Sequence, residues 1–373
     1  MVLLRGPVHG ISGEDAAVLV QDGHIAWVGT GRPPAGAEQE LRADSGELIA
    51  PGFIDLQVNG FNGHDASQGA EAISAISSAL PAYGVTSFLP TIISRPLDEA
   101  QAFVRAASAA AAPGARVLGA HLEGPFLNPA FRGAHDRANL VEPTPERVAM
   151  VLRVPPRMVT LAPELPGALD AVARLFEAGV IVAAGHTGAD FEQGQRAIDA
   201  GVRFGTHLYN AMPAFHHRRP GVVGALLMDD RVTVGLIGDG EHLHPATLEQ
   251  VLRLKRPSHV ALTTDQTSAA GAPAGRYQLG GRAVVSDGSA VRLEDGTLAG
   301  SVATMDELVR RIAELPDGSR EGAVTAATES PAAVLHEPEL GRLGAGAHAD
   351  LIILDAQMRV RLTMVAGRIV FQR

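Results

Sequence analysis

Residues 180–207, VIVAAGHTGADFEQGQRAIDAGVRFGTH, contain the unit from which most of the chain is built. An apolar run at 180–185 has the length of a buried strand, residues 190–200 have a helical pattern, and 202–207 form a second strand-like run. A strand, a helix and a strand in this order are typical of a parallel βαβ unit. His186 follows the first run and His207 ends the second, which predicts two imidazoles at one edge of the sheet.

The same alternation continues on both sides of this stretch. Alanine-rich helical segments separate most of the strand-like runs, as at 68–82, 97–111, 167–178 and 245–254. This alternation of strand-like and helical segments predicts an α/β protein whose main part is a (β/α)8 TIM-like barrel. The strand-like runs are 53–58, 86–91, 116–122, 158–163, 180–185, 202–207, 231–238 and 259–264.

The two chain ends have a different sequence pattern, with short β-rich runs separated by turns. Residues 20–29, VQDGHIAWVG, predict a hairpin with Asp22-Gly23 as its turn. The C-terminal runs DLIILD, RVRLTMVAG and RIVFQR are similar. We therefore expect residues 1–50 and 347–373 to form one small β-sandwich domain, and residues 51–346 to form the barrel.

Composition narrows the classes of function. Of the 373 residues, 46% are hydrophobic and 19% charged, which allows a large core. A net charge of −10 and only 4% aromatic residues argue against nucleic-acid binding. No apolar run is long enough to cross a membrane, and the N-terminus lacks the core of a signal peptide, so we expect a cytoplasmic protein. The chain has no cysteine, which excludes disulfides and thiolate chemistry.

Four polar residues follow predicted barrel strands and carry the chemistry. They are Glu123, His186, His207 and Asp265. Any one of them alone is more often structural than functional, but four at the same rim of a barrel indicate an active site. Two imidazoles and a carboxylate can hold one divalent metal, and a separate carboxylate can move protons.

Several segments carry a resemblance to a known family. HLEGPF, GHTGA, THLYNAMP, DGEHLHP, TTDQTSAAG and LAGSVATM resemble the N-acetylglucosamine-6-phosphate deacetylases of the amidohydrolase superfamily. The match runs from APGFIDLQVNG near residue 50 to GAGAHADLIILD near residue 350. It implies hydrolysis of the N-acetyl group of N-acetylglucosamine 6-phosphate, which gives glucosamine 6-phosphate and acetate.

The resemblance implies the roles of the catalytic residues. Glu123, His186 and His207 would bind one divalent metal per subunit, zinc first, with iron or another divalent metal as alternatives. Asp265 would be the general base that activates water and the acid that protonates the leaving amine. His135, in RGAHD, would act with it by contacting the carbonyl or the sugar.

Many members of the superfamily carry His-x-His after the first strand, as half of a two-metal centre. This chain has Gln57 and Asn59 at those positions. Amides are weak zinc ligands compared with imidazole, so we expect a vestigial second site and a single metal.

The resemblance also implies the substrate contacts. His216-His217-Arg218-Arg219 supplies local positive charge for an anionic substrate, and Arg218 falls on the family's phosphate-binding arginine. Because this loop reaches a neighbouring subunit in relatives, we expect a homodimer. The implied contacts are Ala134, His135, Asn210, Ala211, Arg218, Asp239, His242, Leu298, Ala299 and Gly300.

The sequence leaves three alternative functions open. The substrate could be an epimeric amino sugar 6-phosphate, with galactosamine or mannosamine in place of glucosamine. The protein could be a catalytically silent sugar-phosphate-binding relative of the amidohydrolases. It could also be another amidohydrolase, such as a cyclic amidase or a deaminase. A dihydroorotase-like site would need His-x-His and a carboxylated lysine, but Lys255 is the only lysine and lies far from the predicted rim.

Overall fold

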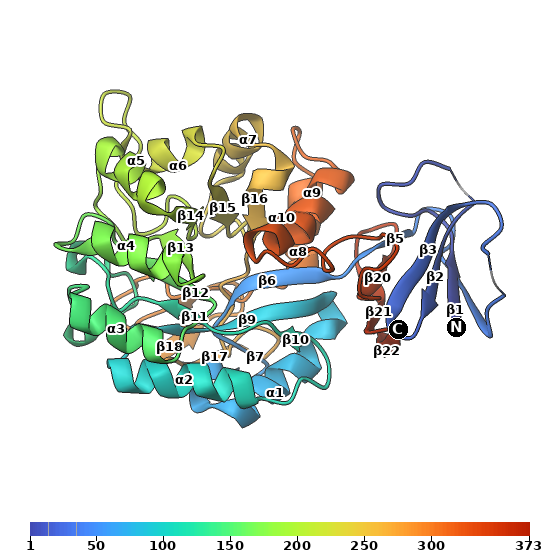
Figure 1. Cartoon of the computed structure of the whole chain (residues 1–373), viewed down its shortest axis with the longest axis horizontal. Coiled ribbons are helices and arrows are strands. Elements are labelled where there is room, and N and C mark those ends of the chain that lie inside the picture. Colours follow the sequence, from blue (N-terminus) through green and yellow to red (C-terminus); the bar gives the residue numbers. More distant parts are fainter. Residues whose placement is uncertain (14, 35) are drawn as a thin grey trace.

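A computed structural model describes residues 1–13, 15–34 and 36–373. A barrel surrounded by helices forms the larger part, and two small sheets built from the chain ends lie beside it along the long axis (Figure 1). The predicted α/β barrel with a chain-end β-sandwich is confirmed.

The barrel is a sheet in which every pair of neighbouring strands is parallel. An isolated parallel bridge between Val58 and Gln266 brings the first and last strands together, so the barrel is nearly closed. The strands are β6 (Phe53–Val58), β9 (Val85–Ile93), β10 (Arg116–Val117), β11 (His121–Glu123), β12 (Met158–Leu161), β13 (Ile181–Ala184), β14 (Val202–Gly205), β15 (Thr233–Leu236) and β16 (Val260–Leu262).

One predicted strand differs from the observed one. The run 116–122 is split into β10 and β11, which pair with different parts of β9. Gly119 lies between them with a φ of 116°, a backbone conformation that interrupts a regular strand. The second part, β11, ends on Glu123 and keeps it at the rim.

Ten helices of the described residues accompany the barrel, mostly on its outside (Figure 1). They bury their apolar sides against strands that are themselves buried on both faces, as parallel sheets require. Their bounds are α1 (Ala70–Ala79), α2 (Leu97–Ala109), α3 (Pro145–Arg153), α4 (Ala168–Glu177), α5 (Phe191–Ala200), α6 (Gly221–Met228), α7 (Pro245–Leu254), α8 (Met305–Ala313), α9 (Arg320–Ala327) and α10 (Glu329–Val334).

The interior of the barrel is filled at the end opposite the active rim. Phe204 lies fully buried there with side chains from the neighbouring strands, and α10 packs against the same cluster. The phenyl ring of Phe204 fits there because β15 carries Gly235, where an added Cβ would come within 2.7 Å of the Phe204 Cζ atom. The barrel therefore has a solid floor beneath its rim.

The chain ends form a sandwich of two sheets. One contains β1 (Val2–Arg5), β2 (Ala16–Gln21), β3 (His24–Thr30) and β4 (Gln39–Arg42); the other contains β5 (Leu48–Pro51), β20 (Leu351–Leu354), β21 (Val360–Val365) and β22 (Arg368–Gln372). Apolar residues of both sheets, such as Val18 and Ile353, share one core. The predicted hairpin is present, with Asp22 and Gly23 both at positive φ in its turn.

A small antiparallel sheet that the sequence analysis missed follows the last barrel strand. It contains β17 (Gly275–Leu279), β18 (Arg282–Ser286) and β19 (Val291–Arg292), and it packs on residues of the rim such as Ile93 and Ala134. A two-stranded ribbon of β7 (Gly60–Phe61) and β8 (His64–Asp65) follows β6.

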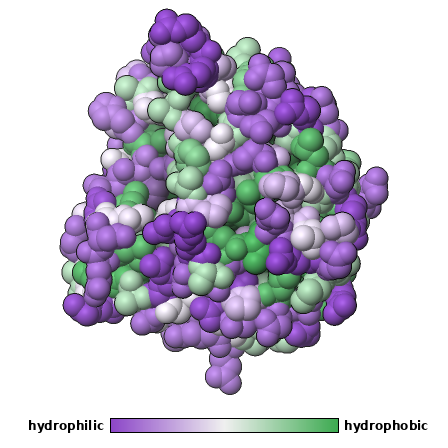
Figure 2. All heavy atoms as spheres, turned by 90° about the vertical axis from the view of Figure 1, so that its left-hand side faces the viewer, coloured by the Kyte–Doolittle hydropathy of each residue, from purple (hydrophilic) through white to green (hydrophobic). Residues whose placement is uncertain are grey.

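The barrel strands have a common direction. Because β6 leaves the sandwich directly after β5, the strands start near the sandwich and their carboxyl ends point away from it (Figure 1). Figure 2 views the molecule from the side to which these ends point, with apolar residues near the middle of the face and hydrophilic ones around them. None of the helices in the described residues has both the length and the hydropathy that a membrane span requires.

Candidate active site

The side chains of Glu123, His186 and His207 meet at the carboxyl end of the barrel. The Glu123 Oε1 atom lies 2.9 Å from His207 Nε2 and 3.2 Å from His186 Nε2, and the two Nε2 atoms are 3.1 Å apart. All three residues are buried. Strands β11, β13 and β14 thus deliver one ligand-type atom each to the same point.

These separations fit a single cation. In a tetrahedral site with bonds of about 2.0–2.1 Å, neighbouring ligand atoms lie roughly 3.3–3.4 Å apart. Two imidazole nitrogens and a carboxylate oxygen that converge at this spacing are a typical zinc donor set. The residues present therefore fit a catalytic divalent metal.

A hydrogen bond at its second ring nitrogen orients His186, which follows β13. The Nδ1 atom of His186 lies 2.9 Å from the carbonyl oxygen of Phe131. A proton on Nδ1 donates to that carbonyl and leaves the Nε2 lone pair free for a metal. The ring is thus held in the tautomer that metal binding requires.

Three of the four predicted residues occupy an unusual backbone conformation. The φ angles of His186, His207 and Asp265 are 48°, 29° and 48°. Residues with a Cβ atom rarely adopt positive φ, and such strain is concentrated at functional sites. The bend redirects each side chain at the point where its strand stops.

Glu123 is ionised within this cluster. Burial alone would raise its pKa, but its interactions with the rings of His135, His186 and His207 outweigh burial and hold the pKa well below the usual range. The Gln57 Nε2 atom donates a hydrogen bond to Glu123 Oε1, at 3.0 Å. With these polar partners the buried carboxylate is a fixed negative charge.

His135 lies against the same carboxylate in a defined tautomer. The backbone N–H of Ser94 donates to His135 Nδ1 at 3.0 Å, so Nδ1 is an acceptor and the proton is on Nε2. Nε2 lies 3.5 Å from Glu123 Oε2. Burial lowers the pKa of His135 to about 4, which keeps the ring neutral. It is therefore a neutral N–H donor at the pocket.

Asp265 lies apart from the ligand cluster and bonds to a different residue. The Asn59 Nδ2 atom donates to Asp265 Oδ1 at 2.7 Å. Burial and then the negative charge of Glu123 raise the pKa of Asp265 to about 8. A carboxyl group that titrates near neutral pH can both accept and return a proton.

Buried Asp55 supports both sides of the site from below. It accepts the Thr264 hydroxyl at 2.6 Å and the backbone N–H groups of Thr264 and Gln57 at 3.2 Å each. These bonds fix the strand residue before Asp265 and the start of the Gln57–Asn59 segment. Asp55 was not among the predicted site residues, although a carboxylate inside an apolar strand indicates a buried polar role.

The site opens into a pocket of about 330 Å³. Most of the predicted residues line it: Asn59, Glu123, Ala134, His135, His186, His207, Asn210, Ala211, His242, Asp265, Leu298 and Gly300. Lining residues that were not predicted are Ile93, Ala130, Phe131, Gly133, Leu279 and Thr297. Leu279 comes from the unpredicted sheet β17–β19, which explains why the sequence pattern did not indicate it.

Four predicted residues are not part of the pocket lining. Gln57 donates to Glu123, Asp239 binds the Nδ1 atom of His242 at 2.7 Å, and Ala299 is buried in the apolar cluster that includes the β17–β19 sheet. Arg218 is exposed in the turn between the bridge partners His216 and Arg219. This turn belongs to the loop between β14 and α6, which projects beyond the helices in Figure 1. A hydrophilic projection occupies the corresponding place at the top of Figure 2.

Lys255 is far from this chemistry, as its sequence position suggested. Its Nζ donates to the carbonyl oxygens of Asp229 and Val232 at 2.6 and 2.9 Å, in the connection that leads into β15. Both amine hydrogen bonds are structural, and the lysine is not available to the rim.

Comparison with known proteins identifies the family. The model of the Amidohydrolase family matches residues 48–370. The chain belongs to the Amidohydrolase family. An amidohydrolase barrel with a His/His/Glu cluster at its rim agrees with the resemblance noted in the sequence.

Three relatives show which amidohydrolases are similar. N-acetylglucosamine-6-phosphate deacetylase of Bos taurus is 38% identical over 352 residues, which are 89% of this chain and 86% of that protein. N-acetylgalactosamine-6-phosphate deacetylase of Shewanella sp. (strain ANA-3) is 36% identical over 371 residues, 96% of this chain and 92% of that protein. A solved mutant N-acetyl-D-glucosamine-6-phosphate deacetylase from Mycobacterium smegmatis, in complex with N-acetyl-D-glucosamine-6-phosphate, has a TM-score of 0.92 at 35% identity; the match covers 100% of this chain and 99% of that one.

We predict that Asp55 makes the stability of this amidohydrolase depend on pH. Burial raises the pKa of Asp55 from 3.8 to about 7, so between these values the folded chain binds a proton that the unfolded chain does not. This group's contribution to the free energy of unfolding therefore falls as pH rises, by about 1.4 kcal/mol per unit. Asp55→Asn does not titrate and should remove that slope in denaturant unfolding at about pH 5, 6 and 7. The control is Asp98→Asn, an exposed carboxylate on α2; an equal change of slope there would contradict the assignment to Asp55.

Proposed function

We propose that this amidohydrolase removes the acetyl group of N-acetyl-D-glucosamine 6-phosphate and releases D-glucosamine 6-phosphate and acetate. One observation carries the proposal: a three-atom cation site and the separate carboxyl group of Asp265 face the same pocket. Two of the three relatives described above are deacetylases of this substrate. All pocket residues come from 51–346, so we assign catalysis to that barrel domain and leave the domain of residues 1–50 and 347–373 outside the site.

Glu123, His186 and His207 would hold the catalytic cation, and we propose Zn²⁺ because two imidazoles and a carboxylate suit it; Fe²⁺ or another divalent metal is the alternative. When bound, the cation supplies Lewis acidity, which makes water more acidic and polarises the amide carbonyl. We infer one ion in the active site of each subunit, because Gln57 and Asn59 use their amide N–H groups to bind Glu123 and Asp265.

Asp265 would carry the proton in both directions. As a base it takes a proton from the attacking water, and as an acid it returns that proton to the nitrogen of the leaving amino sugar. Protonation of the nitrogen is needed because an amide anion is a very poor leaving group. The bond from Asn59 holds one carboxyl oxygen, so the other faces the reaction.

His135 would stabilise the oxygen of the acetyl carbonyl as it becomes negative. Its Nε2–H is neutral, buried and fixed by Ser94, so no reorganisation is needed when the charge develops. The Nδ1 atom of His242 donates to the Asp239 carboxylate at 2.7 Å, which fixes this second ring. His242 lines the pocket, where we propose that it binds a sugar hydroxyl.

We propose that the phosphate is bound across a homodimer interface. Asn210 and Ala211 line the pocket in their own chain, whereas Arg218 is exposed on the projecting loop and lies outside that lining. Phe215 on the same loop leaves 48% of its surface exposed, an apolar side chain that contact with a second subunit would cover. Arg218 would then supply a guanidinium to the neighbouring pocket.

The galactosamine epimer is the second candidate, favoured by the similarity to the Shewanella enzyme. Paired assays decide between them. After metal removal and addition of one equivalent of Zn²⁺ per chain, we expect acetate release from N-acetylglucosamine 6-phosphate with a higher kcat/KM than from the galacto and manno epimers. A preference for the galacto form would contradict the assignment, and tight binding without acetate release would favour a silent binding protein.

We predict that Asp265→Asn loses turnover but still binds metal and substrate. Loss of general acid–base catalysis lowers kcat by roughly 10²–10⁴-fold. Asparagine keeps the shape and can still accept the Asn59 bond. Steady-state kinetics, zinc content and substrate binding by calorimetry are measured together, with Asp295→Asn, an exposed rim aspartate, as the control. Wild-type turnover in Asp265→Asn would remove this residue from the mechanism.

We predict that Arg218→Ala raises KM for the phosphorylated substrate by about 10- to 100-fold, the range expected for one charged hydrogen-bonded contact. KM for unphosphorylated N-acetylglucosamine should change little. Arg219→Ala is the matched control, because it removes the same charge from the next position. Equal effects on both substrates, or equal effects of both variants, would refute a specific phosphate contact.

A further inference from the structure

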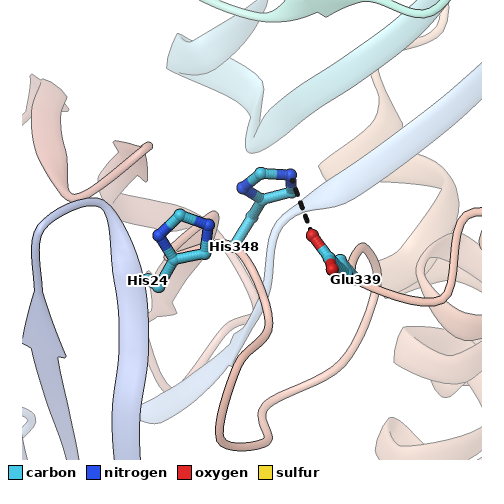
Figure 3. A group of neighbouring side chains, drawn as sticks. All are labelled: His24, Glu339 and His348. Atoms are coloured by element: carbon cyan, nitrogen blue, oxygen red, sulfur yellow. Dashed lines mark ion pairs between the residues drawn. The ribbon is translucent and has the colours of Figure 1, made fainter.

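A second cluster of metal-ligand side chains lies outside the active-site pocket (Figure 3). His24 begins β3, His348 precedes β20, and Glu339 lies in the segment after α10. The two imidazole ring centres are 5.0 Å apart, and His348 Nε2 lies 3.6 Å from Glu339 Oε2. One ligand atom from each residue falls within 4.8 Å of the other two.

The backbone holds the two histidines opposite each other. Ile25 N–H donates to Ala347 O at 2.8 Å, and Ala349 N–H donates to Gly23 O at 2.9 Å. These bonds flank His24 and His348, which therefore form the non-hydrogen-bonded pair of a short antiparallel bridge. In such a pair the side chains lie on one face at their closest approach.

The backbone also fixes the third residue. His348 N–H donates to the carbonyl oxygen of Glu339 at 2.9 Å. The His24 Nδ1 atom lies 3.1 Å from the carbonyl oxygen of Asp22, and a proton on Nδ1 would leave the Nε2 lone pair free for a metal. Main-chain hydrogen bonds thus hold the backbones of all three residues close together, whatever rotamers their side chains adopt.

We propose that His24, His348 and Glu339 bind one Zn²⁺ ion, with water as the fourth ligand. Two imidazoles and one carboxylate are an established zinc donor set. Ligand atoms around zinc lie roughly 3.3 Å apart, so the atoms must approach by at most about 1.5 Å. The side chains of His348 and Glu339 are 29% and 58% exposed, so rotation about their χ angles needs no repacking of the core.

The ion would join three segments that are distant in the sequence. His24 belongs to the N-terminal sheet, His348 leads into the C-terminal strands, and Glu339 follows the last barrel helix. Zinc at this point links the sandwich to the barrel and stabilises their junction. Because none of the three residues lines the pocket, this site acts on stability and not on turnover.

Equilibrium dialysis against buffered free Zn²⁺ tests the site in the full-length protein. We expect two equivalents of zinc per chain in the wild type and one in His24→Gln/His348→Gln, with unchanged catalytic activity. His64→Gln, an exposed histidine outside both clusters, should retain two equivalents. Glu339→Gln leaves the histidine pair intact and should weaken the second site at least about 10-fold.

Zinc added beyond the first equivalent should raise the thermal unfolding midpoint of the wild type and not that of the double variant. A wild type that saturates at one equivalent, or a double variant that still binds two, would overturn the proposal. Stoichiometry is measured without substrate, so the result is independent of the proposed deacetylation.

Discussion

The carboxylate of Glu123 is the group on which the arrangement of the rim depends. A buried negative charge is costly unless it is fully paired, and here Gln57, His186 and His207 all converge on one of its oxygens. These partners come from β6 and from the ends of β13 and β14. Side chains alternate between faces along a strand, so a shift of one residue in any of these strands would turn its partner away from the carboxylate. Glu123 therefore keeps its partners only when these strands are in the correct register.

The strained backbone at the rim has a direct structural use. If each strand continued in a regular extended conformation, the residue after its buried part would lie further along the strand axis, past the pocket. Positive φ at His186, His207 and Asp265 bends the chain there instead, at a cost on the order of 1–3 kcal/mol per residue. The floor of the barrel, packed around Phe204, holds the strands below rigidly enough to maintain these conformations.

Much of the fold could be predicted because its signals are local. The strand over 53–58 was predicted with its observed bounds, and the DG hairpin followed from two residues in the turn. Helix α6, GVVGALLM, was missed because an apolar sequence on all sides has no helical periodicity. The sheet β17–β19 was missed because its short strands alternate with turn residues in a segment where the barrel pattern had already ended.

The candidate site shows the same division between local and long-range information. The four chemical residues follow apolar runs, so their rim position could be read from the sequence. The tautomer of His135 depends on Ser94, a residue 41 positions away, and the exposure of Arg218 depends on how its loop leaves the barrel. No local pattern encodes such contacts, which is why the resemblance placed both residues in a substrate site but could not say how either one is held.

The two His/His/Glu clusters contain the same residue types, and their geometry separates their expected behaviour. The rim cluster is buried, and its three ligand atoms lie 2.9 to 3.2 Å apart. The junction cluster is more exposed, and its atoms are spread over as much as 4.8 Å. An ion at the rim meets ligands that are already placed, whereas an ion at the junction must first order exposed side chains, which costs conformational entropy. The rim would therefore be the tighter site for the proposed zinc, and the junction would fill only at a higher concentration of free zinc.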